Sequence, residues 1–461
     1  MNNYDLIVIG AGAAGLTAAI AFLREAEARQ GGAAHCEARG EGIGGAGGGC
    51  ADARVLLLDA NGEPGKKILA TGNGRCNLSN TSADGWRDTK DFFQSTGVLL
   101  CEDEGGRVYP QSRQAAAVRD ALVREAVRLG AEILCETRVA AVSEAGGGGF
   151  CVKAERSGEP KTLSKGVRRA GSGAPEGRGE PRVFSAKRVI VATGGKACPA
   201  YGNFGDGYAI ARGFGIEVNP IRPALVPFVY EAGVKERFAA LAGVRAKAKV
   251  ELLARLGGDG GTDNGGGGGD GADNDGGGGA EIGAARIPSA CDAACDVIAS
   301  SEGEVQFASY GLSGICVFDL SRYYTGGGGH AIRIDLAPMH AEHDIAGLLA
   351  SGRAAGLAGV VHSKIAEYIE RNAGDAIAAA ALVKRLTVPV SGTKGWKEAQ
   401  ITAGGVSLGE VHMDSYEAKK TPGLYFAGEA LDYDGASGGY NLDFAWNSGM
   451  KAGRAAAATL S

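Results

Sequence analysis

Six residues near the start of the chain have the spacing that holds a phosphate group. Residues 10–15, GAGAAG, read GxGxxG and stand between the apolar run "DLIVIG" and a helix-like segment. In this context Gly10 permits a tight turn, Gly12 lets a pyrophosphate approach the backbone, and Gly15 lets helix and strand pack closely. Backbone N–H groups and the positive end of the helix dipole would then face the phosphate charge. The motif predicts a bound dinucleotide.

A carboxylate is expected where the second strand of such a fold ends, because it binds the ribose hydroxyls of the dinucleotide. Asp59 stands there, after the apolar run of "VLLLDAN". It is farther from the glycine motif than the usual separation of roughly 20 residues. The Gly-rich stretch 31–53 accounts for the excess. The alternative is that Asp59 is only a turn residue at a strand end.

A second polar stretch, "TGNGRCNLSN" at 71–80, contains glycines, asparagines, an arginine and a cysteine, and almost nothing to bury. Cys76 could act as a redox thiol. No other cysteine lies near it in the sequence, however, and a free cysteine often packs as a small hydrophobic residue. The stretch could also be a glycine-asparagine turn without a ligand, so the residues alone leave its role open.

Later segments favour FAD over NAD as the dinucleotide. "RVIVATGG" at 188–195 is a strand followed by a turn of small residues, typical of the segment that covers a flavin nucleotide. "TPGLYFAGEALD" at 421–432 resembles a second FAD-binding motif, in which the Glu429 carboxylate can reach the ribitol hydroxyls. The glycines of "GASGGYNLDFAWNSG" then precede a helix, whose positive end suits the pyrimidine edge of a flavin ring.

A second GxGxxG after a strand is absent from the sequence, so a dedicated nicotinamide domain is not expected. NAD(P)H is therefore expected only as a transient electron donor that docks at the exposed face of the flavin. A flavin accepts hydride without a protein nucleophile, and the protein supplies position and electrostatics.

Together these segments resemble the BaiN-like, or aminoacetone-oxidase, family of FAD-binding flavoproteins, a bacterial group of NAD(P)/FAD-dependent oxidoreductases. The resemblance rests on GNGRCN after the second strand and on TAGGV, GLYFAGE and DGxxGGYNLxxA near the end of the chain. It covers both chain ends and parts of the middle. The sequence departs from the family at Asp59, where the family commonly has glutamate, and in three Gly-rich insertions.

In this family the 71–80 loop lies along the flavin, so the resemblance implies that its backbone N–H groups and the Asn77 amide contact the cofactor. Arg75 would steady the pyrophosphate or an anionic substrate. The weak catalytic candidates are Cys76, Arg75 and Tyr440. The residues expected to bind the cofactor are Gly10, Gly12, Ala13, Ala14, Gly15, Asp59, Ala60, Lys67, Thr71, Gly72, Asn73, Gly74, Arg75, Cys76, Asn77, Val139, Ala192, Thr193, Gly194, Gly195, Gly428, Glu429, Asp434, Gly438, Gly439, Tyr440, Asn441 and Leu442.

Strands and helices alternate at both ends of the chain, which indicates an α/β fold with a doubly wound sheet. Between them, short alternating segments such as "AKAKVELLARL" and "AIRIDLAP" indicate a β-rich α+β unit. The sequence thus predicts a split Rossmann-like FAD-binding domain, made of 1–195 and 399–461. An inserted substrate or cap domain would occupy 196–398.

Composition places the chain among soluble globular proteins. It has 461 residues and a net charge of −5, so no general attraction to nucleic acid is expected. No apolar run is long enough to span a membrane. The ten scattered cysteines suggest reduced thiols, and the absence of a secretory signal before the first strand suggests the cytoplasm. No metal site is expected.

Glycine is the compositional outlier, with 79 residues. Much of it lies in three tracts, 31–53, 146–178 and 256–284, which have few large apolar side chains. Such segments bury too little surface to offset their chain entropy. We expect them to be insertions in surface loops.

The sequence predicts a FAD-dependent oxidoreductase that transfers hydride through flavin N5, with NAD(P)H-linked reduction or amine or alkene oxidation-reduction of a small molecule. Two alternatives stay open. One is a non-catalytic or RNA-modification-associated flavin-binding protein, and the other is an NAD-dependent dehydrogenase. The sequence does not name the substrate or the oligomeric state.

Overall fold

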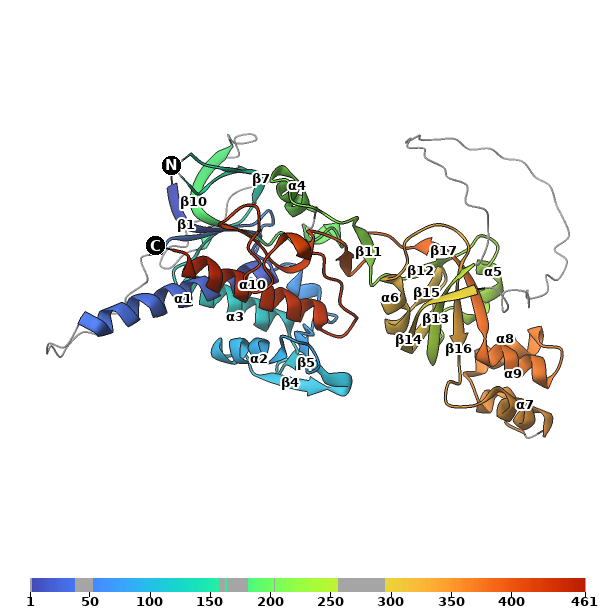
Figure 1. The fold of residues 1–461 in the computed structure, drawn as a ribbon. Helices are drawn as coiled ribbons and strands as arrows, with labels where there is room; N and C mark the ends of the chain where they lie inside the picture. Colours follow the sequence, from blue (N-terminus) through green and yellow to red (C-terminus); the bar gives the residue numbers. More distant parts are fainter. Residues whose placement is uncertain are drawn as a thin grey trace, which may run out of the picture. The chain divides into compact units, whose positions relative to one another are not determined.

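The chain forms two compact units in the computed structural model, which describes residues 2–37, 53–146, 148–156, 162–163, 181–202, 204–255, 295–352 and 354–460. Unit 1 combines the two chain ends, Met1–Val226 and Lys394–Ser461, and unit 2 is Pro227–Thr393. The split α/β fold with a second, β-rich part is thus confirmed (Figure 1). The sequence-based boundaries lie at 195 and 398, whereas the contacts divide the chain at 226 and 393.

Unit 1 is built on a sheet with a parallel centre. Its neighbouring parallel strands are β6 (Glu132–Leu134), β2 (Val55–Leu58), β1 (Asn2–Ile9), β10 (Arg182–Val191) and β19 (Leu424–Phe426). Their apolar runs have both faces covered, as expected for parallel strands. The last of them, β19, comes from the C-terminal part of the chain and pairs directly with β10.

Successive residues of these strands face two different cores. Leu6 and Val8 of β1 belong to the core that also contains residues of α1 (Ala13–Glu37), α3 (Ala115–Arg128) and α10 (Tyr440–Ala458). Figure 1 shows these three helices on one face of the sheet. Ile7 and Ile9 pack on the other face, with α4 (Asp206–Gly213). Because α1 and α10 pack together on the first face, they bring the two ends of the chain side by side.

Glycines allow α1 and α10 to approach closely. A Cβ on Gly449 would lie 2.3 Å from the Ala14 carbonyl oxygen, and one on Gly453 would lie 2.1 Å from that of Ala18. Only glycine fits at such distances, because a real Cβ contact is never so short. The backbones of α10 and α1 are therefore in direct contact at Gly449 and Gly453.

Two expectations about the glycine tracts were wrong at their edges. Antiparallel β8 (Phe150–Arg156) lies inside the tract predicted as a loop at 146–178, and it pairs with both β10 and β7 (Thr137–Glu144). Alternate residues of β8 are buried. The free energy gained by this burial outweighs the preference of the nearby glycines for a loop. Helix α1 continues to Glu37 and so enters the tract of 31–53, which was expected to be a loop insertion. The remainder of the tracts lies largely outside the described residues.

Smaller elements complete unit 1. A three-stranded sheet begins at the end of the 71–80 loop. A two-stranded pairing joins residues before and after unit 2, which explains why unit 1 extends to 226. These elements are β3 (Ser79–Asn80), β4 (Leu100–Asp103), β5 (Arg107–Pro110), β9 (Thr162–Leu163), β11 (Arg222–Ala224), β18 (Ile401–Ala403), α2 (Trp86–Ser95) and the 3-10 turns Ile68–Ala70, Glu104–Gly106, Pro199–Tyr201, Leu408–Glu410 and Gly428–Ala430.

Unit 2 contains a closed barrel with helices packed against it. The strands follow in the order β12 (Phe228–Tyr230), β15 (Gly311–Ser313), β14 (Cys295–Phe307), β13 (Arg245–Arg255), β16 (His330–Asp335) and β17 (Leu386–Thr393). The helices are α5 (Lys235–Phe238), α6 (Ile315–Ser321), α7 (Glu342–Ala350), α8 (Ser363–Asn372) and α9 (Ala376–Lys384), with 3-10 turns at Ala239–Leu241 and Gly356–Gly359. Stacked aromatic rings fill its core, with Phe238 between Tyr230 and Tyr368.

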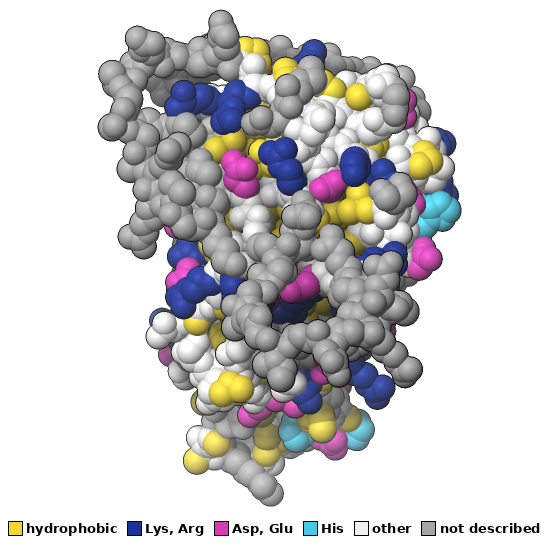
Figure 2. All heavy atoms as spheres, turned by 90° about the vertical axis from the view of Figure 1, so that its left-hand side faces the viewer, with side chains coloured by type: hydrophobic (Ala, Val, Ile, Leu, Met, Phe, Trp, Pro, Cys, Tyr) yellow, Lys and Arg dark blue, Asp and Glu magenta, His cyan; other side chains and the backbone are white. Residues whose placement is uncertain are grey.

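The surface carries both signs of charge. On the face shown in Figure 2, described Lys and Arg side chains are interspersed with Asp and Glu. The structure shows free thiols at Cys76, Cys101, Cys135, Cys151, Cys198, Cys295 and Cys316. Within the described ranges no helix has the length and apolar character needed to cross a membrane.

Candidate cofactor site

Four parallel strands of unit 1 end in register at one edge of the sheet. Ile9 lies opposite Leu58 on one side and Val191 on the other, and Val191 lies opposite Phe426. The residues that follow these strand ends are Gly10, Asp59, Ala192 and Ala427. Ligands of open α/β sheets bind at this carboxyl edge. The strand register therefore brings motifs from the whole length of the chain to one place.

The phosphate turn has two glycines that face protein and one that faces open space. Gly10 has a φ of 99°, and a Cβ there would lie 2.4 Å from the Ala192 carbonyl oxygen. A Cβ on Gly15 would lie 1.8 Å from the Gly10 carbonyl oxygen. Around Gly12, by contrast, no heavy atom of the described residues, its chain neighbours aside, lies within 4 Å of the Cβ position. Packing explains the first and third glycines, and the second leaves the clearance that a pyrophosphate requires.

Asp59 fastens the phosphate turn to the end of β2. Its Oδ2 accepts a hydrogen bond from the Ala11 N–H at 2.8 Å, and its Oδ1 accepts from the N–H and the side-chain Nδ2 of Asn61 at 2.8 and 3.0 Å. The side chain is buried, and burial raises the pKa of this carboxyl above its ordinary value. A carboxylate offers about four acceptor positions, so one remains for a ribose hydroxyl.

The C-terminal segment returns directly to the phosphate turn. A Cβ on Gly428 would lie 2.8 Å from the Ala14 Cβ, and the Gly428 N–H donates to Ser448 Oγ at 2.9 Å. The φ of 70° at Gly428 is in the left-handed region that favours glycine. Sequence motifs more than 400 residues apart thus meet at one turn.

A partly buried ion pair lies beside this turn. Lys67 Nζ lies 2.5 Å from Glu429 Oε2, and both side chains keep some exposed surface. The other oxygen, Oε1, accepts from the Thr402 N–H at 2.9 Å. The Thr402 hydroxyl in turn accepts from the N–H groups of Lys196 and Ala197 at 2.7 and 3.0 Å. Thr402 belongs to the TAGGV motif, but no local sequence pattern predicts that it holds Glu429 in place.

The 71–77 loop is held in a strained, tightly curled backbone. Gly72, Asn73, Gly74 and Cys76 all have left-handed φ values, between 56° and 79°. The Cys76 N–H closes the curl by donating to the Thr71 carbonyl at 2.9 Å. Left-handed backbone at non-glycine residues is costly, and such strain clusters at ligand sites.

Asn77 carries a polar atom for which the described part of the chain supplies no hydrogen-bond partner. Its side-chain Oδ1 is buried, and no donor among the described residues reaches it. A buried acceptor without a hydrogen bond costs about 1–3 kcal/mol. A hydroxyl or N–H of a bound cofactor would satisfy it, so Asn77 and the open side of Gly12 both fit a dinucleotide in this site.

The weak catalytic candidates have different environments. The Cys76 side chain is completely buried, and burial raises the pKa of its thiol to about 12. Such a thiol is not a nucleophile at neutral pH, because the thiolate is the reactive form. Arg75 is exposed, with its Nε donating to the Gly72 carbonyl at 3.3 Å and its guanidinium 5.4 Å from the Tyr109 ring centre. The Tyr440 hydroxyl lies 2.8 Å from Ser82 Oγ.

The N-terminus of α10 lies against the end of the 71–80 loop. Gly439 has a φ of 109°, and a Cβ there would lie 2.3 Å from the Ser79 carbonyl oxygen. The Asn441 amide fixes the preceding turn, because its Oδ1 accepts from the Gly435 N–H at 2.8 Å and its Nδ2 donates to the Gly435 carbonyl at 2.9 Å. The amide of Asn441 is thus engaged with its own loop.

Asp443 is a residue that sequence reasoning missed. It lies in the first turn of α10, is buried, and accepts at Oδ1 from Ser79 Oγ at 2.6 Å and from Thr89 Oγ1 at 2.7 Å. Asn447 Nδ2 donates to the Thr89 hydroxyl at 2.8 Å. Burial raises the pKa of Asp443 above its ordinary value. No local pattern could reveal it, since its partners are about 350 residues away in sequence.

Other predicted residues have structural places. Thr193 Oγ1 accepts from the Gly207 N–H at 3.1 Å, and Gly194 has a φ of 73°. Leu442 packs against the α1/α10 core, and Val139 is buried in β7 in the opposite core. Val139 is therefore a packing residue in this structure, and its contact with a cofactor stays a prediction.

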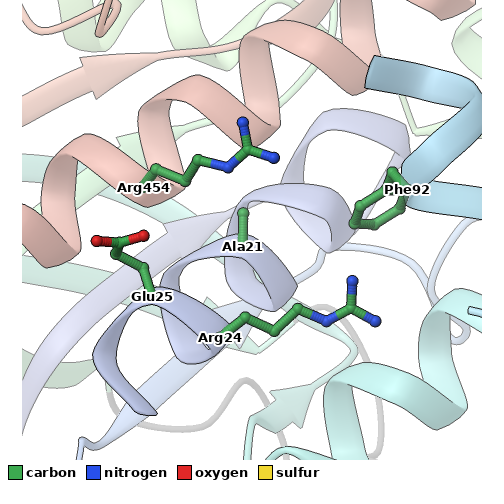
Figure 3. A pocket seen from close by; sticks show the side chains of 5 residues that line it. All are labelled: Ala21, Arg24, Glu25, Phe92 and Arg454. Atoms are coloured by element: carbon green, nitrogen blue, oxygen red, sulfur yellow. The ribbon is translucent and has the colours of Figure 1, made fainter. Parts of the chain in front are cut away.

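A surface pocket of unit 1 lies elsewhere. It is lined by Ala21, Arg24, Glu25, Phe92 and Arg454, from α1, α2 and α10 (Figure 3). Its first lining residue is roughly two helical turns along α1 from the phosphate turn. The pocket contains none of the predicted site residues. Across the ranges that the structure describes, no three His, Cys, Asp or Glu side chains form a group that could hold a metal ion.

Comparison with known proteins supports the flavin motifs. The family model described as the HI0933-like protein Rossmann domain matches residues 165–455. The 3-dehydro-bile acid delta(4,6)-reductase of Clostridium scindens is 32% identical, with 98% of each chain covered. The ribosomal RNA dihydrouridine synthases of Escherichia coli and Haemophilus influenzae are each 26% identical. Both cover 97% of this chain, and the matches span 96% and 97% of the relatives.

Proposed function

The chain belongs to the HI0933-like family of FAD-dependent oxidoreductases, and from this premise we propose that it reduces a carbon–carbon double bond conjugated to a carbonyl group. A delta(4,6)-reductase and a dihydrouridine synthase have this chemistry in common: each adds hydrogen across a double bond that a carbonyl activates. The higher identity to the first favours a small molecule as the substrate.

The arrangement at the sheet edge supports FAD binding. The observation that carries most weight is the contact of Gly428 with Ala14, beside a Gly12 that faces open space. The pyrophosphate would lie over the 10–15 turn, with Asp59 on the ribose and Glu429 on the ribitol. Asn77 and the N-terminus of α10 would meet the flavin. Bound FAD would supply two-electron hydride transfer, while these residues hold and orient it.

NAD(P)H is the electron donor that we propose for this cycle. The sequence has no second phosphate-binding GxGxxG, so the nicotinamide would dock transiently and leave before the substrate enters. Arg75 is an exposed residue of the 71–80 loop and could attract an anionic donor or substrate.

An absorbance spectrum of the purified protein, followed by anaerobic titration with NADH and with NADPH, tests the proposal. We expect a flavin spectrum that bleaches with one of the two donors and recovers when an α,β-unsaturated ketone is added. A protein without flavin absorbance that oxidises an alcohol with NAD would instead be a dehydrogenase. Bound flavin that no nicotinamide or acceptor affects would favour a binding role.

A ribosomal RNA substrate is the second candidate, because two relatives at 26% identity are named as ribosomal RNA dihydrouridine synthases. The two candidates differ in a direct assay. Reduced protein is mixed anaerobically with either a steroid enone or unmodified ribosomal RNA, and flavin reoxidation is followed. Reoxidation by RNA alone would replace the small-molecule proposal.

A further inference from the structure

We propose that Asp443 is a buried anion that lowers the reduction potential of the flavin held at the start of α10. This inference rests on the proposed binding of FAD. Asp443 does not need to touch the cofactor, so it would act as a tuning and positioning residue. It would decide how strong a donor is needed to reduce the enzyme.

The contacts around Asp443 are those of a carboxylate. Ser79 Oγ and Thr89 Oγ1 both approach Oδ1, at 2.6 and 2.7 Å. The Thr89 hydroxyl accepts from Asn447 Nδ2 at 2.8 Å, which leaves its own proton to be donated to Asp443. Asn447 Nδ2 also lies 3.3 Å from Oδ2. Hydrogen bonds that are donated to a carboxylate stabilise its charged form.

The position of Asp443 in α10 adds to this effect. It stands in the first turn, and its own N–H closes a helical bond to the Gly439 carbonyl at 3.0 Å. The positive end of the helix dipole favours a negative charge at this place. Burial works in the opposite direction and raises the pKa of the group. The donors and the dipole are the features that would keep it ionised at neutral pH.

A charge at this place opposes flavin reduction. Two-electron reduction gathers negative charge at the pyrimidine edge, which the α10 N-terminus would stabilise. The Asp443 carboxylate cancels part of that stabilisation, and its effect is only weakly screened because the residue is 3% exposed. Removal of this charge should therefore make the bound flavin easier to reduce.

The same network also positions the start of α10 relative to the 71–80 loop and α2. Asp443 joins α10 to Ser79 in β3 and to Thr89 in α2. A variant that keeps the shape but removes the charge is needed to separate the two roles. Asp443→Asn is such a variant, since the serine and threonine hydroxyls can each donate or accept.

The test is the midpoint potential of bound FAD, measured by anaerobic dye-coupled titration at pH 7. Asp443→Asn should shift it upward by at least the ~30 mV that corresponds to a tenfold change in a two-electron equilibrium. Asp88→Asn removes the same charge from an exposed position of α2, next to Thr89, and should leave the potential unchanged. An unshifted potential in Asp443→Asn with FAD fully bound would overturn the inference.

A second variant covers the case in which Asp443→Asn does not fold. Asp443→Asn with Asn447→Asp exchanges the two bonded side chains and moves the charge one turn along α10, about 6 Å. The potential should then lie above that of the wild type, and a value at or below the wild type would contradict the inference. Wild-type protein that binds no FAD would refute the proposed function itself, which is a different outcome.

Discussion

The two halves of the proposed cofactor site are assembled in different ways. The phosphate half, residues 10–15 with Asp59, follows neighbouring strands that end in register, and it is fastened by the Ala11–Asp59 bond. The flavin half, residues 71–80 with the start of α10, depends on buried polar contacts such as Ser79–Asp443, which join residues 364 positions apart. The sheet therefore determines the geometry of the phosphate half. A network of hydrogen bonds, which a single substitution can alter, determines the geometry of the flavin half.

This difference suggests that the two halves control different properties of the bound cofactor. The phosphate half offers open space and a fixed carboxylate, so it should control whether FAD is retained. The flavin half contains strained backbone and a buried acid, so it should control how the bound flavin reacts. Substitutions in the two halves are therefore expected to have separable effects.

Gly12→Ala should have the largest effect on FAD retention. Among the described residues, its chain neighbours aside, no atom lies within 4 Å of the new methyl group, so the apoprotein should fold normally. It would occupy the space of the pyrophosphate, and we expect FAD affinity to fall about a hundredfold, or ~2.8 kcal/mol. Fluorescence titration of apoprotein with FAD measures this loss.

Two other glycines serve as controls for that substitution. Gly347→Ala places a methyl group in similarly open space on α7 and should not change FAD affinity. Gly15→Ala should destabilise the fold, because its Cβ would lie 1.8 Å from the Gly10 carbonyl oxygen. If Gly12→Ala binds FAD with wild-type affinity, the pyrophosphate does not lie over residues 10–15 and the proposed phosphate half is wrong.

The sequence made the phosphate half largely predictable, since the GxGxxG spacing, the apolar strands and Asp59 are local patterns. It could not show that Asp59 bonds Ala11, or that Thr402 holds Glu429, because these pairs depend on strand register and on the returning chain. In the flavin half, the resemblance drew attention to the 71–80 loop. The burial of Cys76 became visible only in the folded structure.

The strand missed at 150–156 shows another limit of the sequence. "FCVKAER" alternates buried and exposed residues, as a strand should, but it is short and follows directly after a run of glycines. Local composition favoured a loop there. Pairing with β10 and β7 makes this segment a strand, and the residues next to it in the sequence do not reveal that pairing.

Asp59→Ala should weaken FAD binding about tenfold, or ~1.4 kcal/mol, because Ala11 loses its acceptor and the ribose loses its carboxylate. Calorimetric titration of the apoprotein measures the change. Asp88→Ala, at an exposed position, is the matched control. If Asp59 is only a turn residue, stability will fall while FAD affinity stays at the wild-type value.

Asp443→Asn should change how stability depends on pH. Burial raises the pKa of Asp443 in the folded protein above 3.8, so the stability linked to its proton is present below that pH. It is lost as the pH rises through the folded pKa. The asparagine variant has no such loss and should gain stability relative to the wild type as the pH rises above 3.8.

Urea unfolding followed by tryptophan fluorescence can measure this difference, since Trp86, Trp396 and Trp446 all belong to unit 1. Apoprotein is used at a series of pH values from 3.5 to 8, approximately the range over which such a group titrates. A constant difference between the two proteins at every pH would show that Asp443 has no shifted pKa.

Cys76→Ala should have the smallest effect. The thiol has a pKa of about 12 and no exposed surface, so turnover should stay within about twofold of the wild type. In native protein at pH 8 the Cys76 thiol should also resist alkylation, which mass spectrometry of the digested protein detects. A loss of turnover with unchanged FAD content would make Cys76 part of the chemistry and reverse the interpretation of this loop.

Hydrogen–deuterium exchange of the apoprotein, with and without added FAD, tests most directly whether the two chain ends bind one cofactor together. We predict slower amide exchange on FAD binding at residues 10–15, at 71–78 and at 436–443. Protection confined to the first of these segments, with the other two unchanged, would contradict the proposed site.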